Sequence, residues 1–329
     1  MDNRHPIYAF AGRRLLLRRE GEGLRVPLRQ ELEGLVEMGG AHEVLMNSGR
    51  EVWAVAVDEA TASPTLALAS VATSFALTSG RVALAPVSTS TTAASPALAL
   101  TSDVATSTSA LSHNPETPTP QPTPAPQCGR TGVGAPWTWV DLRQSYYCLP
   151  LDDYLAAGKA SEILYWDSHS RFCPACGTPT RRSTPIMKLC PACGMELYPP
   201  VATAIIVLIQ RGDEVLLVRA RNFRGTHYGL VAGFLEAGET LEECVRREVR
   251  EETTLEISDI RYFGSQPWPY PCGLMVGFTA RYVSGNLRLQ EEELTTAAFF
   301  RRDNLPELPQ QLSIARRLID WWVSREGMV

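Results

Sequence analysis

The sequence has little that would direct the protein to a membrane or out of the cell. Its apolar run at 204–209 is far shorter than the roughly 20 residues that a membrane-spanning helix needs. The first ten residues, MDNRHPIYAF, lack the basic-then-apolar layout of a signal peptide. The last three, GMV, are not a peroxisomal signal of the SKL type. We therefore expect a cytoplasmic protein that does not bind membranes.

The sequence also lacks a surplus of basic residues. It has 31 Lys and Arg against 36 Asp and Glu, and thus a formal net charge of −5. Without a basic surface over the whole protein, any binding of nucleic acid must be local. At 329 residues, of which 44% are hydrophobic, the chain is long enough for two or three globular units.

Large apolar side chains are scarce between residues 59 and 136, where Ala, Ser, Thr and Pro dominate. Such a segment has little apolar surface to offset the entropy of ordering it, so we expect a disordered insert. Alternating patterns at 14–18 and 51–57 predict short strands before the insert, and TWVDL at 138–142 predicts another after it. An amphipathic pattern over 151–169 predicts a helix. Together these segments indicate a small β-rich N-terminal domain in two parts.

Cysteine is concentrated between residues 170 and 200, where the sequence CPACG occurs twice, at 173–177 and 190–194. Four thiolates on two tight turns suit tetrahedral Zn2+, and this spacing is typical of a zinc ribbon. Disulfides are the competing use, but they are rare inside cells. Because Cys173, Cys176, Cys190 and Cys193 fill all four ligand positions, we expect one structural zinc ion per chain. The remaining four, Cys128, Cys148, Cys244 and Cys272, show no ligand spacing and are interpreted as unpaired thiols.

Residues 233–255, GFLEAGETLEECVRREVREETTL, combine a Gly-rich turn with a helical pattern. An apolar stripe at 241, 244, 245 and 249 can dock on a core. Glu248, Glu251 and Glu252 share the opposite face, where their like charges repel. A hard divalent cation such as Mg2+ or Mn2+ would neutralise them. The alternative is a solvated acidic face with arginine partners supplied by 246, 247 and 250.

The spacing of these residues resembles the Nudix box, the signature of a superfamily that hydrolyses nucleoside diphosphates linked to another group. The matching positions are Gly233, Glu239, Arg247-Glu248-Val249, Glu251-Glu252 and Leu255. One position departs, because the family has Gly where this chain has Thr254. That Gly usually lies just past the helix end in a left-handed conformation, so Thr there is expected to cost about 1 kcal/mol. It does not touch a metal ligand.

Two strands are expected at 202–209 and 214–218, joined by a turn at 211–213, with a third at 228–232 and a second helix at 312–324. Periodicity alone gives an α+β fold, and the resemblance implies the Nudix α/β/α sandwich. The expected order is an N-terminal β-rich domain, first part (1–58), the disordered insert (59–136), the rest of that domain with a connecting helix (137–169), a zinc ribbon (170–200) and a Nudix domain (201–329).

Residues 265–271, SQPWPYP, alternate proline with Gln, Trp and Tyr, which predicts a stiff loop that presents aromatic faces. A purine or nicotinamide ring would stack on such faces; an edge segment with its aromatics in the core is the other interpretation. The segment resembles the SQPWPFP motif of NADH pyrophosphatases within the Nudix superfamily. This chain has Tyr270 for Phe and Gly273 for Ser, and keeps Met275.

The resemblance assigns roles to individual positions. The divalent-metal ligands fall on the backbone carbonyl of Ala232 and on Glu248, Glu252 and Glu293, with Glu251 as a further catalytic residue and Glu251 or Glu293 as the base. The substrate contacts fall on Arg143, Tyr198, Gln266, Pro267, Trp268, Pro269, Tyr270, Pro271, Cys272, Gly273 and Ala315. The implied reaction is hydrolysis of NADH or NAD+ to AMP and a nicotinamide mononucleotide. The resemblance also implies removal of NAD caps from RNA, and a homodimer.

Two alternatives remain open at this point. The chain can be a Nudix hydrolase of another nucleoside diphosphate derivative, such as ADP-ribose. It can also be a non-catalytic module whose zinc ribbon binds nucleic acid. The retention of Glu248, Glu251 and Glu252 side by side speaks against the second, because an inactive protein gains nothing from repelling carboxylates.

Overall fold

The computed structural model describes residues 5–21, 23–33, 35, 42–45, 51–57, 136–221 and 225–325. The predicted insert therefore lies outside the described residues, apart from Pro136. Within the described part of the chain, no helix has both the length and the apolar character needed to cross a lipid bilayer.

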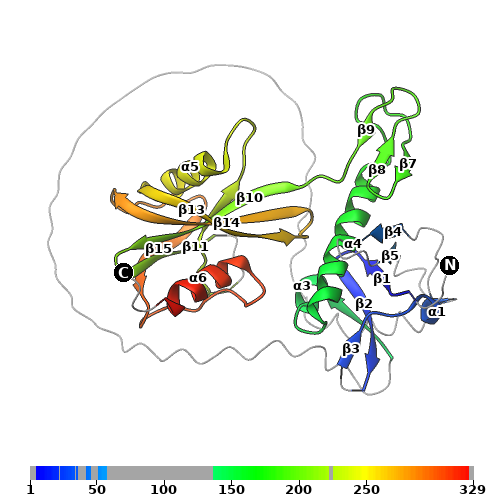
Figure 1. The fold of residues 1–329 in the computed structure, drawn as a ribbon, viewed down its shortest axis with the longest axis horizontal. Helices are drawn as coiled ribbons and strands as arrows, with labels where there is room; N and C mark the ends of the chain where they lie inside the picture. The colour runs from blue at the N-terminus through cyan, green and yellow to red at the C-terminus, as the bar shows by residue number, and fades with distance from the viewer. Residues whose placement is uncertain are drawn as a thin grey trace, which may run out of the picture.

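The N-terminal unit is built on a six-stranded sheet (Figure 1). Its strands are β1 (Ile7–Ala11), β2 (Arg14–Glu20), β3 (Gly23–Arg25), β4 (His42–Leu45), β5 (Glu51–Ala56) and β6 (Trp137–Asp141), in the order β3-β2-β1-β5-β4, with β6 paired to β2. Strand β6 follows residues 59–135 in the sequence and pairs with β2. The two parts of the predicted N-terminal domain therefore form one sheet.

Helices cover this sheet. They are α1 (Arg29–Leu32), α3 (Leu142–Ser145) and the long α4 (Leu151–His169), whose bounds agree with the sequence pattern. Side chains alternate along β1, as expected of a sheet buried on both faces. Tyr8 and Phe10 pack with Ala157 and Ile163 of α4 in one core. Ile7 and Ala9 belong to a second core with Trp139.

The ribbon follows α4 directly and consists of β7 (Arg181–Thr184), β8 (Met187–Leu189) and β9 (Glu196–Leu197). A buried lysine joins it to the end of α4. Lys188 Nζ donates to the backbone carbonyl of Asp167 at 2.8 Å, lies 3.0 Å from its carboxylate, and sits 5.4 Å from the Trp166 ring centroid. Arg182 makes a second ion pair with Asp167 at 2.7 Å. Since the charge of Lys188 is paired, its burial is tolerated.

The C-terminal unit is a second six-stranded sheet. Its strands are β10 (Ala202–Arg211), β11 (Glu214–Ala220), β12 (Val231–Phe234), β13 (Glu256–Trp268), β14 (Gly273–Ser284) and β15 (Leu294–Arg301), in the order β13-β14-β10-β11-β15, with β12 paired to β10. The central β10 runs parallel to β14 and antiparallel to β11 and β12.

The two remaining helices, α5 (Leu241–Thr253) and α6 (Ile314–Ser324), lie on opposite faces of this sheet (Figure 1). Alternate residues of β10 face them. Ile205 and Val207 pack in one core with Val245 and Val249 of α5. Residues 206 and 208 pack in another with residues 318 and 319 of α6. The predicted α/β/α sandwich is confirmed, within an α+β protein.

Three local predictions differ from the structure. Residues 265–268 continue the edge strand β13 rather than forming a loop. Pro267 is tolerated there because β13 is hydrogen-bonded on one side only. The strand predicted at 228–232 begins at Val231, and α6 begins at Ile314 because Ser313 caps it, its side chain accepting a hydrogen bond from Arg316 N.

Candidate active site

The ends of α5 are defined by local hydrogen bonds. At the start, Thr240 and Glu243 form a capping box: the Thr240 side chain accepts from Glu243 N, and the Glu243 carboxylate accepts from Thr240 N at 2.8 Å. At the end, Thr254 has φ 58°, the left-handed conformation expected at the position where the family has Gly. Its hydroxyl donates to Asn286 O at 2.6 Å, which compensates for part of the backbone cost.

The glutamates of α5 differ in burial. Glu252 is only 4% exposed, and the Glu248 side chain is 13% exposed, whereas that of Glu251 is 52% exposed. Glu248 lies directly against β12, since a Cβ added to Gly233 would be 1.9 Å from its carboxyl carbon. The glycine at the start of the motif therefore provides the space that a carboxylate fills, next to Ala232, whose carbonyl is a predicted metal ligand.

Glu293 joins this cluster from another part of the chain, in the turn before β15. Burial raises the pKa of Glu252 to about 8. The negative charges of Glu248, Glu293 and Glu251 act in the same direction. The pKa of Glu248 is also raised, chiefly by burial, and Glu293 contributes to that shift. Of the acidic run at 291–293, Glu293 is the residue whose charge raises both pKa values, which favours it as the member of the run that faces the helix.

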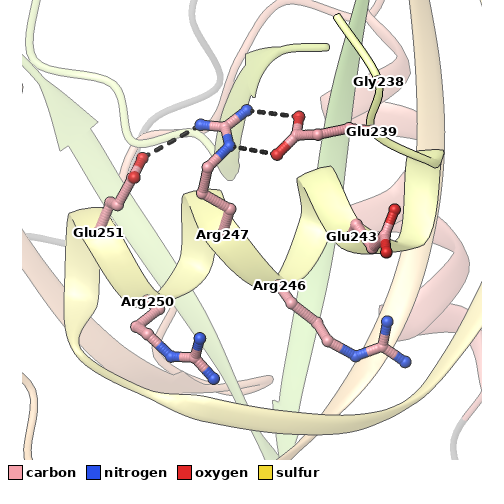
Figure 2. Close-up of a pocket in the computed structure, with 7 residues that line it drawn as sticks. All are labelled: Gly238, Glu239, Glu243, Arg246, Arg247, Arg250 and Glu251. Carbon is pink, nitrogen blue, oxygen red and sulfur yellow. Dashed lines mark hydrogen bonds and ion pairs between the residues drawn. The ribbon is translucent and has the colours of Figure 1, made fainter. Parts of the chain in front are cut away.

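Arg247 is the cationic partner of the cluster (Figure 2). Its guanidinium donates to Glu239 at 2.5 and 2.9 Å, to Glu248 at 2.9 Å and to Glu251 at 3.1 Å, and it also donates to Phe234 O. These bonds hold the pKa of Glu239 at about 2. The arginine partner expected of a solvated acidic face is therefore present. It serves Glu248 and Glu251 but not Glu252.

The carboxyl of Glu252 has no hydrogen-bond donor or ion-pair partner among the residues that the structure describes. A buried carboxylate without a partner is costly, and a cation would relieve that cost. Oxygen donors from Glu248, Glu252 and Glu293 are the ligand type that Mg2+ and Mn2+ prefer, so these residues fit a divalent metal. Their oxygen atoms are spread more widely than the thiols of the ribbon. In the described ranges, the only group of three or more metal-ligating side chains whose donor atoms all lie within 4.8 Å is the cysteine cluster.

An open hollow of about 530 Å³ lies along the exposed side of α5 (Figure 2). It is lined by Gly238, Glu239, Glu243, Arg246, Arg247, Arg250 and Glu251. It shares Arg247 and Glu251 with the acidic cluster but does not include Glu248, Glu252 or Glu293. The chemistry of the buried carboxylates, rather than the size of this hollow, marks the candidate site.

The aromatic segment lies where the two units meet. Trp268 ends β13, and Tyr270 follows in the turn to β14. The Arg143 guanidinium carbon lies 5.1 Å from the Trp268 ring centroid and 4.6 Å from that of Tyr270, which is cation–π geometry. Arg143 Nε is buried without a hydrogen-bond partner among the described residues. The structure thus brings Arg143 together with two of the other predicted substrate contacts.

Other predicted substrate contacts have structural partners. The Gln266 side chain donates to Leu312 O at 2.7 Å and accepts from Ile314 N at 2.6 Å, so both ends of its amide fasten the start of α6. Ala315 lies in the first turn of α6 and is buried in the core between this helix and the sheet. The Tyr198 ring is exposed, and its hydroxyl donates to Glu196 at 2.7 Å.

The Cβ of a residue other than glycine at position 273 would lie 3.0 Å from Trp268 O, so the turn is tight where the family has Ser. Pro269 is buried, whereas Pro267 and Pro271 are exposed. Cys272 is a free thiol of intermediate exposure.

Sequence reasoning did not assign Arg247 or Tyr154 to the site. Arg247 matched the motif, but only its contacts reveal that it pairs with three carboxylates. Tyr154 was expected as part of an amphipathic helix face, and its hydroxyl lies 2.9 Å from that of Tyr270. No sequence signal connects residues that are 116 positions apart.

The four cysteines of the ribbon converge as expected. Their Sγ atoms lie within 4.8 Å of one another, with separations of 3.4 Å for Cys176 and Cys190 and 3.6 Å for Cys173 and Cys193. A tetrahedron with metal–sulfur bonds of about 2.3 Å has edges of about 3.8 Å, so the cluster fits zinc. Of the other cysteines, Cys244 and Cys272 are free, but Cys148 is disulfide-bonded, so its interpretation as an unpaired thiol is wrong. Cys128 lies outside the described residues.

Comparison with known proteins agrees with this geometry. The family model of the NUDIX domain matches residues 199–322, and that of the NADH pyrophosphatase-like rudimentary NUDIX domain matches residues 5–166. The chain is 47% identical to the NAD-capped RNA hydrolase NudC of Pseudomonas aeruginosa over 190 residues, which cover 57% of this chain and 68% of that protein. It is 42% identical to the protein of the same name from Chromobacterium violaceum, over 55% of this chain and 69% of that one.

Among solved structures, the chain is similar to a NUDIX hydrolase from Nitrosomonas europaea, with a TM-score of 0.41 and 21% identity over 47% of this chain and 92% of that chain. The two family models match separate parts of the chain, in agreement with the two-unit architecture. The chain therefore belongs to the Nudix hydrolases, in the group that joins a NADH pyrophosphatase-like N-terminal unit to a C-terminal NUDIX domain.

Proposed function

We propose that this protein hydrolyses the pyrophosphate bond of NADH or NAD+, giving AMP and reduced or oxidised nicotinamide mononucleotide. Water adds across the bridging P–O–P bond, so that one phosphate keeps the bridging oxygen and the other gains the oxygen of water. The observation that carries the proposal is the buried carboxyl of Glu252, which has no protein partner among the described residues and lies near Glu248 and Glu293. The aromatic segment next to Arg143 and the names of the relatives support the choice of substrate.

In this proposal Mg2+ or Mn2+ is held by the Ala232 carbonyl and by Glu248, Glu252 and Glu293. When bound, such ions neutralise the phosphate charges and make a bound water more acidic. Glu251 or Glu293 accepts the proton of the attacking water. Both side chains are exposed enough to reach solvent.

Arg247 has a supporting role in the proposal. By donating to Glu239, Glu248 and Glu251, it restricts the side-chain positions of Glu248, a proposed metal ligand, and of Glu251, a proposed base. This preorganisation reduces the reorganisation needed when substrate binds. Substrate recognition falls to residues 266–273 with Arg143, Tyr198 and Ala315, of which Trp268 and Arg143 offer a ring face and a cation. The Gln266 side chain is bonded to the start of α6, and the Ala315 side chain is buried in the core. These two residues would therefore contribute to binding by positioning the backbone around the substrate.

NAD-capped RNA carries the same pyrophosphate and is the substrate named in the relatives, so we include cap removal in the proposal. One structural Zn2+ per chain at Cys173, Cys176, Cys190 and Cys193, assembly as a homodimer and a cytoplasmic location belong to it as well. The zinc assignment is supported by the spacing of the Sγ atoms.

The deciding experiment compares turnover of NADH, NAD+ and ADP-ribose with Mg2+ and with Mn2+, following AMP release. A preference for NADH supports the proposal, and NAD-capped RNA is then the next substrate. Equal rates keep the Nudix chemistry but remove the role of the aromatic segment in specificity. Absence of any turnover favours the non-catalytic nucleic-acid-binding alternative.

The matched variant is Glu252→Gln, which keeps the shape of the side chain and removes its charge. Turnover is expected to fall by a factor of at least about 100, the size typical of losing an essential electrostatic contact, while zinc content and folding stay as in the parent. Near-normal turnover of this variant would contradict the assignment of Glu252 to the metal site.

A further inference from the structure

The segment that follows Trp268 is seated on the N-terminal unit. The Tyr270 ring packs against the hydrophobic core that contains Tyr154, Ala157 and other residues of α4. Its hydroxyl lies 2.9 Å from the hydroxyl of Tyr154, which is itself 5% exposed. The middle of the predicted substrate-binding segment therefore packs against a different unit from the one that carries the glutamates.

Pro269 makes a second contact with the same helix. A Cβ added to Gly158 would lie 3.1 Å from Pro269 Cγ, closer than ordinary van der Waals contact. Gly158 is buried in the middle of α4, where glycine is a poor helix former. The absence of a side chain at this position lets the proline ring approach the helix.

The Tyr270 hydroxyl, which completes the pair with Tyr154, stands where the motif that this chain resembles has Phe. Both hydroxyls are protonated at neutral pH, and burial raises their pKa values further, so the pair keeps its hydrogen bond. Arg143 of α3 makes a third contact with this segment, because its guanidinium packs on the rings of Tyr270 and Trp268. The backbone between Trp268 and Pro271 is thus restrained on the side that faces the N-terminal unit.

We propose that Tyr154 and Gly158 are positioning residues that set the affinity for the nicotinamide half of the substrate. Tyr154 acts through its hydrogen bond to Tyr270, and Gly158 acts through its close contact with Pro269. Together these contacts fix the orientation of the neighbouring Trp268 ring. The inference rests on the proposed function and adds a task for the N-terminal unit: it supports the recognition segment of the NUDIX domain. A role in packing alone would affect all substrates equally.

The test uses the full chain and measures KM and kcat for NADH and for ADP-ribose, which lacks the nicotinamide. Tyr154→Phe is expected to raise KM for NADH about three- to tenfold, the effect of one neutral hydrogen bond, with kcat within about twofold and KM for ADP-ribose unchanged. Tyr165→Phe, which removes a hydroxyl from the same helix away from the segment, is the matched control and should leave both KM values unchanged.

Gly158→Ala supplies an independent variant. Its thermal stability should stay close to that of the parent, because the preference of alanine for the helix offsets the cost of the close contact with Pro269. Its KM for NADH should nevertheless rise as the added methyl displaces Pro269. Ser161→Ala, on the same helix, is its control. In the double variant Tyr154→Phe/Tyr270→Phe, KM should not exceed that of the more affected single variant, because the two hydroxyls act as one pair.

The outcomes separate this inference from the proposed function. If the parent hydrolyses NADH but Tyr154→Phe and Gly158→Ala change KM for NADH and ADP-ribose by the same factor, or change neither, the positioning role is wrong and the function stands. If the parent protein has no NADH turnover, the proposed function fails and the inference fails with it.

Discussion

The carboxyl carbon of Glu248 lies where a side chain on Gly233 would begin, 1.9 Å from the position of its Cβ. The first glycine of the motif and the first glutamate of the cluster are therefore a complementary pair from different elements, β12 and α5. The contact explains why a glycine is needed at Gly233 without any appeal to backbone conformation, since its φ is not positive.

Gly233→Ala should displace the Glu248 carboxylate from β12 and break its bond to Arg247. Turnover is expected to fall at least about 100-fold, because a misplaced catalytic group costs that much. The measurement is kcat with saturating Mg2+, alongside circular dichroism to confirm folding. Gly264→Ala in β13, where a Cβ would meet no atom closer than 4.0 Å, is the control. Full activity of Gly233→Ala would show that the cluster tolerates a different placement of Glu248.

Substitutions of Thr254 test how the C-terminal end of α5 is stabilised. Replacing it with Gly relieves the left-handed strain of about 1 kcal/mol but removes the hydrogen bond to Asn286 O, so the free energy of unfolding should change by less than about 1 kcal/mol. Thr254→Val keeps the strain and loses the bond, so it should destabilise by about 1–2 kcal/mol. Urea denaturation measures both. A Thr254→Val variant as stable as the parent would mean that the hydroxyl contributes nothing.

Glu162 in α4 should make stability depend on pH. Burial raises its pKa to about 7, against an ordinary value of 4.5, while Lys159 partly opposes the shift. Because the folded state holds this proton more tightly than the unfolded state, stability is lost as pH rises from about 4.5 to about 7.

Glu162→Gln should remove that loss, so the variant gains at most about 3 kcal/mol over the parent between about pH 4.5 and about pH 8. Urea denaturation at several pH values gives the comparison. The exposed Glu242→Gln, treated in the same way, should run parallel to the parent. A constant difference between Glu162→Gln and the parent would show that Glu162 titrates normally.

Zinc removal should loosen the ribbon without touching the glutamates. Metal analysis is expected to find one zinc ion per chain, and a strong chelator should lower Tm, because structural zinc contributes directly to folding. Cys190→Ser should behave like the chelated protein. Lys188→Met, which breaks the link to Asp167, should keep its zinc but lower Tm. Retention of the parent Tm after complete zinc loss would contradict a structural role.

Much of the fold followed from local patterns. The helical period over 151–169 and the alternation over 202–209 predicted α4 and the core of β10, because each reflects a face that must be buried. The bounds that differed are those set by contacts between distant residues. Ser265–Trp268 joined β13 because β14 offers hydrogen-bond partners on one side, which a loop pattern of prolines conceals.

The sequence alone determined the chemistry of this protein: four cysteines in two CPACG turns, a glycine and glutamates at the spacing of the Nudix box, and a segment of prolines and aromatics. These features are local, and a helix or a tight turn sets their geometry within a few residues. Only the tertiary structure decided which groups remain without partners and which serve the fold. Among the described residues, Glu252 lacks a partner because α5 buries it, Gln266 is occupied by the start of α6, and Tyr270 is held by Tyr154. Such pairings depend on the packing of segments far apart in the chain, for which no spacing in the sequence gives a signal.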